Sequence, residues 1–245
     1  MKILVIGETC VDKFVYCKSI RLSPEAPVPV INPLHFTTNN GMAGNTLSNL
    51  KAMFSDAIVA GIHQKQKITK TRYVEEKSNH MFFRVDEGDE FEDKFKWNAF
   101  TDTSIAQADI VIVSDYDKGF LSDLDLKEIA KKSTLSILDS KRKLTNDVIE
   151  DFTFVKLNEL EHQNNPKLTT NNIIVTLGKK GALYNGLIYE SPNPQDTIDV
   201  SGAGDTFTAA FIVKFYQLLE ESAAIKFANR KASEVVSQRG VVTPK

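Results

Sequence analysis

Short apolar runs recur along the chain, and each is about as long as a β-strand. They are rich in β-branched or aromatic residues, and their apolar positions are continuous rather than alternating, which is typical of strands buried on both faces of a sheet. We predict strands at Ile3–Gly7, Ile110–Tyr116, Leu135–Asp139, Phe152–Leu157 and Ile173–Leu177.

Segments that we predict to be helical separate or follow these runs. Strands that alternate with helices favour an α/β fold, with a mostly parallel sheet covered by helices on both faces. Sheets of this kind bind ligands at the carboxyl ends of their strands, so the residues that follow each strand are the first candidates for a site. The predicted helices are Gly44–Met53, Leu124–Lys132, Ala203–Leu219 and Glu221–Gln238.

Two segments depart from this alternation. Lys13–Phe36 contains three prolines within Ser23–Val30, which exclude a helix or a central strand there. Thr71–Val85 alternates between polar and apolar residues and leads into the acidic run Asp86–Asp93. We predict that both segments form strands outside the main sheet, as a small β-lid over its edge. The alternative is that they are long surface loops.

Composition places the chain among ordinary globular proteins. It has 245 residues, of which 42% are hydrophobic and 25% are charged, and no linker or repeat divides it, so we expect a single domain over residues 1–245. The net charge is −2 and no stretch is strongly basic. Nonspecific binding to nucleic acid is therefore not expected.

The apolar runs are all too short to place the chain in a membrane. None approaches the roughly 20 residues that span a bilayer, and Met1–Gly7 is too short for a signal peptide. The two cysteines, Cys10 and Cys17, lack the spacing of a zinc or redox pair. We expect a reduced, cytoplasmic protein without a membrane partner.

The strongest chemical signal is the segment Asp199–Phe207, in which Gly202 and Gly204 open a predicted helix. Helix N-termini carry about half a positive charge and unpaired N–H donors, so they bind anions such as a phosphoryl group. Asp205 lies in the first turn, where a carboxylate can accept the proton of an attacking hydroxyl. The alternative is a glycine-rich turn in which Asp205 only stabilises the helix start. This is not a Walker A loop, because no Gly-Lys-Ser/Thr follows.

This segment closely resembles the signature Asp-Thr-x-Gly-Ala-Gly-Asp of ribokinase-like (PfkB-type) carbohydrate kinases, with Val200 in place of threonine. The resemblance implies a three-layer α/β sandwich with a β-lid, and transfer of the γ-phosphate of ATP to a sugar hydroxyl with Mg²⁺. It also implies that the backbone of Gly202, Ala203 and Gly204 forms an anion hole and that Asp205 is the catalytic base.

The amino-terminal part agrees with this resemblance. Gly41–Asn45 resembles the family's sugar-binding Gly-Gly-x-Gly-Asn element, with Met42 replacing a glycine that the family associates with lid motion. Asp12 matches the family's aspartate that binds sugar hydroxyls. Taken by themselves, Asn45 is equally explained as a helix cap and Asp12 as a surface residue.

Elements of a nucleotide site follow later strands. Asn158–Glu161 matches the family's Asn-x-x-Glu, and Thr176–Gly181 resembles its Thr-x-Gly-x-x-Gly turn, although a simple β-turn with lysines at its tip explains the latter as well. The resemblance makes Glu161 an outer-shell partner of Mg²⁺. It implies nucleotide-binding roles for Lys141, Asn158, Thr176, Gly178, Gly181 and Asn229.

Two stretches narrow the resemblance further. Arg21–Val30 and Ser114–Gly119 resemble bacterial heptose-phosphate kinases, the kinase half of bifunctional ADP-heptose synthases. This implies phosphorylation of heptose 7-phosphate to the 1,7-bisphosphate. The nucleotidyltransferase half is absent from the sequence, so nucleotidyl transfer is not expected of it. Lids of the wider family often pair, which makes a homodimer through Ala26–Val30 an expectation. Arg84 is a candidate for the substrate phosphate, and its alternative is a surface arginine. The substrate-side candidates are Asp12, Glu25, Gly41, Gly44, Asn45, Arg84 and Asp115.

The chain is also shorter than this family normally is. Only nine residues lie between Gly61 and Thr71, where members place another helix and strand, so we expect a scaffold shortened by about one βα unit. Two alternatives stay open. One is a kinase for another sugar or a nucleoside, and the other is a non-catalytic nucleotide- or sugar-binding protein on the same scaffold.

Overall fold

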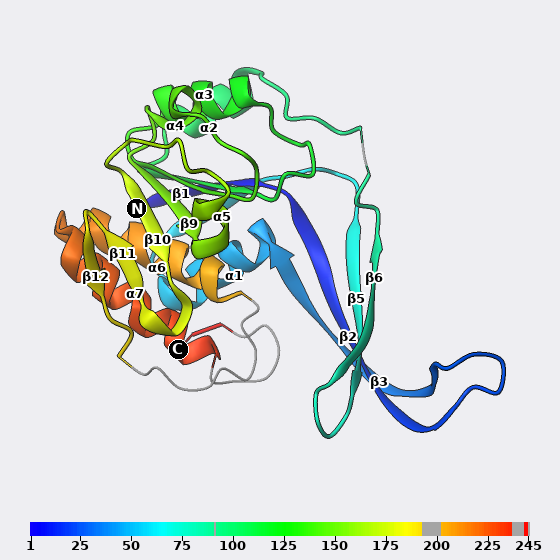
Figure 1. Cartoon of the computed structure of the whole chain (residues 1–245). Helices are drawn as coiled ribbons and strands as arrows, with labels where there is room; N and C mark the ends of the chain where they lie inside the picture. The colour runs from blue at the N-terminus through cyan, green and yellow to red at the C-terminus, as the bar shows by residue number, and fades with distance from the viewer. Residues whose placement is uncertain (91, 193–201, 237–242, 245) are drawn as a thin grey trace.

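The computed structural model describes residues 1–90, 92–192, 202–236 and 243–244. These residues form an α/β body and a long, narrow sheet that projects from it (Figure 1). The two parts meet where β1 (Lys2–Gly7) is followed directly by β2 (Thr9–Leu22) and where β3 (Pro29–Met42) leads into α1 (Ala43–Met53).

The body is built on an eight-stranded sheet in the order β12-β11-β10-β9-β8-β7-β1-β4. The strands from β4 to β10 in this order are parallel, whereas β11 and β12 are antiparallel. The five predicted strands are confirmed, with ends that differ by at most two residues. Besides β1 the strands are β4 (Ile58–Ile62), β7 (Ile110–Asp115), β8 (Ser136–Ser140), β9 (Phe154–Asn158), β10 (Ile173–Thr176), β11 (Ala182–Tyr184) and β12 (Leu187–Tyr189).

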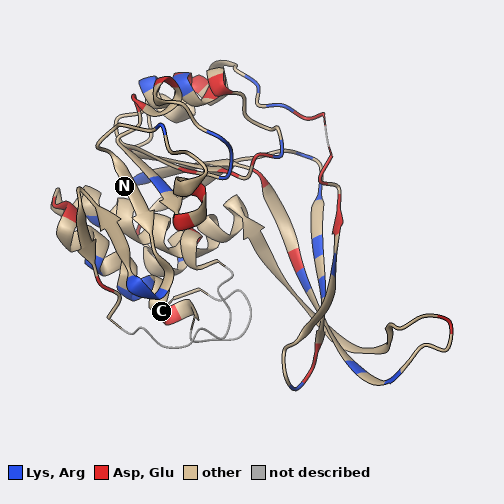
Figure 2. Cartoon of the chain, in the orientation of Figure 1, with Lys and Arg blue, Asp and Glu red and all other residues tan. Residues whose placement is uncertain are grey.

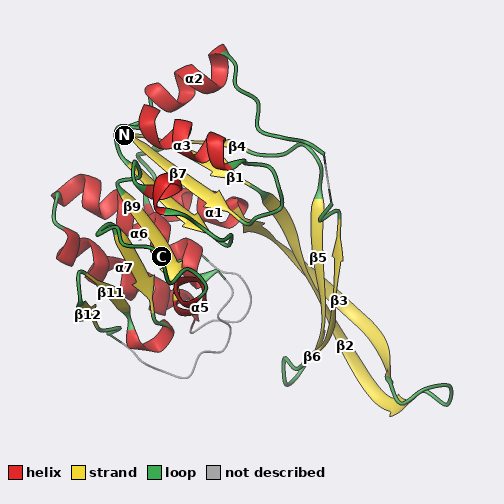
Figure 3. Cartoon of the chain, turned by 45° about the horizontal axis from the view of Figure 1, so that its top comes forward, coloured by secondary structure: helices red, strands yellow, loops and turns green. Residues whose placement is uncertain are grey.

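Helices cover both faces of this sheet because successive strand residues point to opposite sides. Ile3 and Val5 pack with α1, α6 (Ala203–Leu218) and α7 (Glu221–Val236). Leu4 and Ile6 pack with α2 (Ala99–Ala106), α3 (Asp123–Lys132) and α4 (Asn146–Ile149). The three layers are visible in Figure 3. All four predicted helices are present, and the predicted end of the last one, Gln238, lies outside the described residues.

The projecting part is a four-stranded sheet in the order β3-β2-β5-β6, which we call the small sheet. Besides β2 and β3 it contains β5 (Ile68–Glu75) and β6 (Met81–Glu87), so most of both unusual segments forms strands, whereas residues 23–28 and 76–80 are connections between them. β3 is an edge strand, which explains how it tolerates Pro29 and Pro33: a proline has no N–H to donate, and an edge strand pairs on one side only. Basic and acidic residues are interspersed on this sheet and on α3 (Figure 2).

The shortened scaffold shows at the edge of the large sheet. β4 is the last strand, and residues 63–67 connect it directly to β5 of the small sheet. Within the described parts of the chain, no helix is both long and apolar enough to cross a membrane.

Candidate active site

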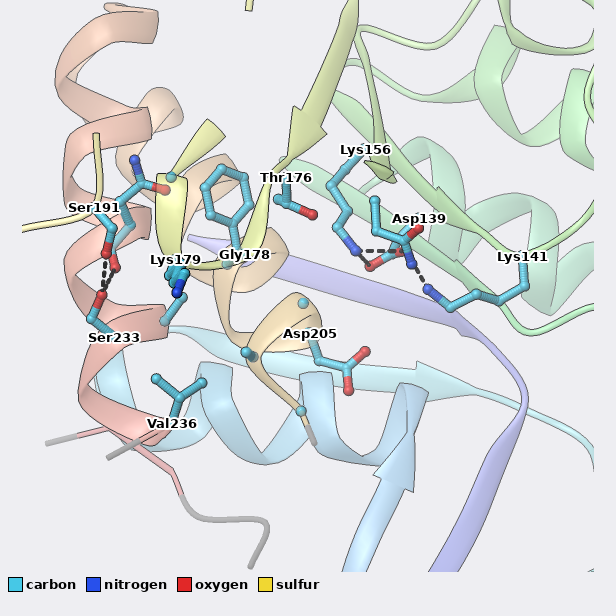
Figure 4. Close-up of a pocket in the computed structure, with 18 of the residues that line it drawn as sticks. Asp139, Lys141, Lys156, Thr176, Gly178, Lys179, Ser191, Asp205, Ser233 and Val236 are labelled. Carbon is cyan, nitrogen blue, oxygen red and sulfur yellow. Dashed lines mark hydrogen bonds and ion pairs between the residues drawn. The ribbon is translucent and has the colours of Figure 1, made fainter. Parts of the chain in front are cut away.

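A cavity of about 390 Å³ lies at the carboxyl ends of the parallel strands, beside the N-terminus of α6. β8, β9 and β10 contribute Asp139, Lys156 and Thr176 to its lining. Figure 4 shows Asp205 and Asp139 at one end of this cavity and Ser191 and Ser233 at the other. The position is the one that the parallel topology favours for ligands.

The N-terminus of α6 presents bare backbone to the cavity. Gly202 precedes the helix with a φ of 83°, in the left-handed region that favours glycine. A Cβ atom on Gly204 would lie 2.8 Å from the Lys156 Nζ atom, so only glycine fits there without moving the lysine. The predicted anion hole at Gly202, Ala203 and Gly204 therefore lines the cavity. Asp199, Val200 and Ser201 lie outside the described residues.

Asp205 is buried, and both of its carboxylate oxygens accept hydrogen bonds. The Tyr116 hydroxyl donates to Oδ1 at 2.9 Å, and the Asn45 amide donates to Oδ2 at 2.8 Å. Burial, together with the charge of Asp139, raises the pKa of Asp205 from 3.8 to about 6, although these two hydrogen bonds and Lys156 oppose the rise. Asp205 is thus a carboxylate whose pKa lies near neutral pH, as general bases require.

Behind Asp205, two lysines flank the buried Asp139. Lys156 Nζ lies 3.1 Å from Asp139 Oδ2, and Lys141 Nζ lies 3.5 Å from Oδ1. Although burial alone would raise the pKa of Asp139, the two ammonium groups lower it to about 2. Asp139 and Glu161 in turn raise the pKa of Lys141 above its ordinary value, against the effect of burial. The ammonium group of Lys141 therefore stays charged, and both lysines line the cavity.

Asn158 and Glu161 form the start of α5 (Glu159–Gln163). The Asn158 side chain accepts from the Glu161 N–H, and Glu161 accepts from the backbone and side chain of Asn158, which is a capping box. Lys141 Nζ lies 2.6 Å from Glu161 Oε1. Both carboxylate oxygens of Glu161 thus have partners. In the parts of the chain that the structure describes, no group of three or more His, Cys, Asp or Glu side chains could hold a metal.

The predicted nucleotide-binding residues come together. The short helix Gly178–Lys180 follows β10, and Gly181 ends it with a φ of 98°. The Asn229 amide on α7 donates to the Tyr189 carbonyl on β12 at 2.7 Å, and this hydrogen bond ties α7 to the edge of the large sheet beside the cavity. All six lie in the cavity lining, namely Lys141, Asn158, Thr176, Gly178, Gly181 and Asn229.

A second cavity of about 140 Å³ lies between the small sheet and α6. Three of the predicted substrate-side residues line it: Asp12, Gly41 and Asn45. Met42, which also lines it, has a φ of 56° just before α1, a conformation that glycine adopts more easily. Gly44 lies one residue from Asn45 but lines a different, adjacent cavity.

Three other substrate-side candidates do not line these cavities. Glu25 is exposed in the connection between β2 and β3. Asp115, at the end of β7, is fully buried and binds Arg142, which follows β8. The Arg142 Nε atom lies 2.6 Å from Asp115 Oδ2, so this ion pair links the ends of the two neighbouring strands. Arg84 is exposed on the edge strand β6 and pairs with Asp86 at 2.8 Å.

Arg72, and not Arg84, lines the second cavity. The two arginines are directly opposite each other on β5 and β6, so they share a face of the small sheet, but β5 is the inner strand. Arg72 forms an ion pair with Asp12 and lines the second cavity together with Lys70. The sequence signal that could have found them is the spacing of two residues between Lys70 and Arg72, which puts both on one face.

Comparisons with known proteins agree with this geometry. A family model described as pfkB family carbohydrate kinase matches residues 48–245. The bifunctional protein HldE of Campylobacter jejuni (strain RM1221) is 30% identical over 287 residues, which cover 99% of this chain and 62% of that protein. HldE of Helicobacter pylori (strain HPAG1) is 29% identical over 300 residues, which cover 98% of this chain and 63% of the relative.

The chain thus spans about 62% of the length of these relatives. The alignment with the Campylobacter protein has 287 positions, whereas this chain has 245 residues, so at least 42 positions have no counterpart in it. This agrees with the short connection between β4 and β5.

Solved structures show the same fold. Ribokinase from Thermotoga maritima superposes with a TM-score of 0.74 at 15% identity, covering 98% of this chain and 94% of that one. Phosphofructokinase-2 from Escherichia coli gives a TM-score of 0.72 at 14% identity, with coverage of 98% and 94%. The fold is therefore ribokinase-like, and its match to the family model over most of its length shows that the chain belongs to the pfkB family of carbohydrate kinases.

Proposed function

We propose that this kinase transfers the γ-phosphate of ATP to a hydroxyl of a sugar phosphate, and that the substrate is heptose 7-phosphate, which becomes heptose 1,7-bisphosphate. The observation that carries the proposal is the position of Asp205, which lines two cavities. One is the cavity of about 390 Å³ beside α6, which we call the large cavity, and the other is the second cavity of about 140 Å³, which we call the small cavity. The similarity to the HldE relatives and the motifs at Arg21–Val30 and Ser114–Gly119 support the heptose phosphate as acceptor.

In the proposed reaction, ATP occupies the large cavity, with its phosphates toward the α6 N-terminus, Lys141 and Lys156. Their positive charge balances the negative charge of the transferring group, which is the main catalytic contribution in phosphoryl transfer. The sugar occupies the small cavity. Its hydroxyl gives its proton to Asp205 while its oxygen bonds to the γ-phosphorus, and the bond from that phosphorus to the β-phosphate oxygen breaks to release ADP.

The substrate phosphate would bind at the cationic side of the small cavity. Lys70 and Arg72 lie on the same strand and face this space, and a guanidinium group binds a phosphate through two parallel hydrogen bonds. Asp12 would hold both Arg72 and a sugar hydroxyl. Glu25 and Arg84 stay predicted substrate contacts, which the small sheet would have to bring closer on closing.

The residues near Glu161 fit an indirect role toward Mg²⁺. Because Lys141 and Asn158 occupy both oxygens of Glu161, this carboxylate suits a partner of metal-bound water rather than a direct ligand. Magnesium often binds in this way, with substrate phosphates and waters as its ligands. When bound, it would neutralise charge on the phosphates.

We further propose that residues 1–245 act as a single kinase domain in which segments 13–36 and 71–86 are a lid. Closing the lid would exclude water and limit hydrolysis of ATP. Apolar side chains such as Ile20, Leu22 and Phe36 are exposed on this sheet, and a second copy of the chain would cover them in a homodimer. The cytoplasm is the proposed location, since the buried Cys10 and Cys17 are both free thiols.

The test is ATP consumption, measured as ADP formed, with Mg²⁺ and a panel of heptose 7-phosphates, fructose phosphates, ribose and nucleosides. We expect turnover with a heptose 7-phosphate and a loss of about 10²-fold or more in Asp205→Asn, because a general base contributes that much. Asp56→Asn is the matched control, because Asp56 is exposed and precedes β4, at the amino ends of the parallel strands rather than at the carboxyl ends where the cavity lies.

Other outcomes distinguish the alternatives. Turnover with only unphosphorylated sugars or nucleosides would replace the substrate but keep the reaction. Binding of ATP without turnover across the panel would favour a non-catalytic binding protein. Full activity in Asp205→Asn would remove Asp205 as the base.

A further inference from the structure

Tyr116 lies where the two cavities meet. Among the residues that the structure describes, three line both cavities, namely Tyr116, Gly202 and Asp205. Gly202 belongs to the anion-binding turn and Asp205 is the proposed base, whereas the function proposed above leaves Tyr116 without a role. Its side chain is nevertheless at the point where the hydroxyl and the phosphoryl group would meet.

The contacts of Tyr116 fix the geometry of Asp205. Its hydroxyl donates to Asp205 Oδ1 at 2.9 Å, while Asn45 on α1 donates to Oδ2 at 2.8 Å. Two donors on different oxygens fix the rotation of the carboxylate, and each oxygen keeps a lone pair for an incoming hydroxyl. The Lys141 Nζ atom also lies 5.5 Å from the centre of the Tyr116 ring, in the range of a cation–π interaction.

The loop that carries Tyr116 is bound through its backbone to the side chain of Glu8, which follows β1. This side chain is fully buried, and its carboxylate accepts from the backbone N–H groups of Tyr116 at 2.9 Å and of Lys118 and Phe120 at 3.2 Å each. Burial raises the pKa of Glu8, and the hydrogen bonds from the Tyr116 and Phe120 N–H groups oppose that rise because they stabilise the carboxylate. Tyr116 is therefore on a rigid support that ties the end of β7 to the end of β1.

We propose that Tyr116 is a positioning residue, which holds the Asp205 carboxylate in the orientation in which it accepts the substrate proton and holds Lys141 beside the transferring phosphoryl group. The proposal rests on the proposed role of Asp205 as base. It adds the group that sets the orientation of the Asp205 carboxylate and helps to set its pKa.

Removing the Tyr116 hydroxyl should change the acidity of Asp205 in a known direction. A hydrogen bond donated to a carboxylate stabilises its ionised form, so its loss raises the pKa of Asp205. The other charged or titratable groups around Asp205 stay the same in such a variant. On the side of the large sheet these are Asp139, Lys141 and Lys156, and on the side of the small sheet they are Cys10, Asp12, Lys70 and Arg72.

The experiment compares the wild type with Tyr116→Phe in two readouts. The first is the pH dependence of kcat/KM with the best substrate. The second is the titration of the Asp205 carboxyl carbon by ¹³C NMR in protein labelled at aspartate, assigned with Asp205→Asn. Tyr216→Phe, at the far end of α6, is the control. We expect the acidic limb and the NMR titration of Tyr116→Phe both to move up by about one pH unit.

The outcomes separate this inference from the proposed function. An Asp205 titration that stays at the wild-type pH in Tyr116→Phe would overturn the positioning role, even if the rate fell. An upward shift in the NMR titration supports it, and does so even if the wild type turns over no substrate in the panel, in which case only the proposed function fails. A loss of stability in Tyr116→Phe without a shift in either titration would mean a purely structural residue.

Discussion

Lys156 and Asp139 form an ion pair inside the protein, in which the Lys156 Nζ atom lies 3.1 Å from Asp139 Oδ2 and the side chains are 2% and 4% exposed. The same Nζ atom occupies the space that a side chain on Gly204 would need. The pair therefore fixes a buried positive charge directly behind the turn that we propose as the anion hole.

Replacing this lysine should destabilise the protein. Lys156→Met would leave Asp139 with only Lys141 and Thr208 as partners, and removing one member of a buried ion pair costs about 3 kcal/mol or more in the free energy of unfolding. We expect that loss in urea unfolding at neutral pH. Lys226→Met on the exposed side of α7 should change the free energy by less than about 0.5 kcal/mol. Equal stability of both variants would contradict the buried pair as described.

The rate should depend on pH in a way that reports Asp205. Its pKa is raised to about 6, and the ionised form is the one that accepts a proton, so activity should be lost as the pH falls through about 6. We expect kcat/KM to be level above that pH and to fall about tenfold per pH unit below it. The residual activity of Asp205→Asn should lack this limb. A wild-type limb near pH 4 would mean that Asp205 keeps an ordinary acidity.

The two opposed arginines of the small sheet offer a matched pair of variants. Arg72→Gln removes one of the two cationic side chains at the small cavity and leaves Lys70, so we expect KM for a phosphorylated sugar to rise about tenfold or more. Arg84→Gln should raise KM less than Arg72→Gln does, because Arg84 is exposed on the edge strand and would contact the substrate only after the small sheet closes. A larger effect at Arg84 would favour the assignment made from the sequence and would indicate that the small sheet closes over the substrate.

The proposed dimer can be tested on the exposed apolar side chains of the small sheet. Ile20 and Phe36 are 85% and 62% exposed. Replacing them with glutamate would bury two charges in the dimer interface, which should prevent association. We expect a dimer of the wild type by size-exclusion chromatography with light scattering, and a monomer of the variant Ile20→Glu/Phe36→Glu. Leu124→Glu on α3 should leave the dimer intact. A wild type that stays monomeric at high concentration would rule out this assembly.

The sequence was sufficient for the elements that depend on local pattern. The continuous apolar runs around Ile3–Gly7 and Ile110–Asp115 predict strands correctly, because a strand buried on both faces has no polar side. The residues at the carboxyl ends of the strands were the first candidates for a site, and Asn158 on β9 and Thr176 on β10 line one cavity because parallel strands end at the same edge of the sheet.

What the sequence determined by itself is therefore the strands with continuous apolar runs, the four longest helices and the glycines at the start of α6, and it is the source of the proposal that Asp205 acts as a base. The tertiary structure alone decided which polar side chains meet. Lys156 contacts Asp139, which is 17 positions away in the sequence, and Tyr116 contacts Asp205, which is 89 positions away. Likewise, Arg72 rather than Arg84 reaches the cavity because β5 is the inner strand. Such contacts depend on strand order and register, which local patterns of polarity do not specify.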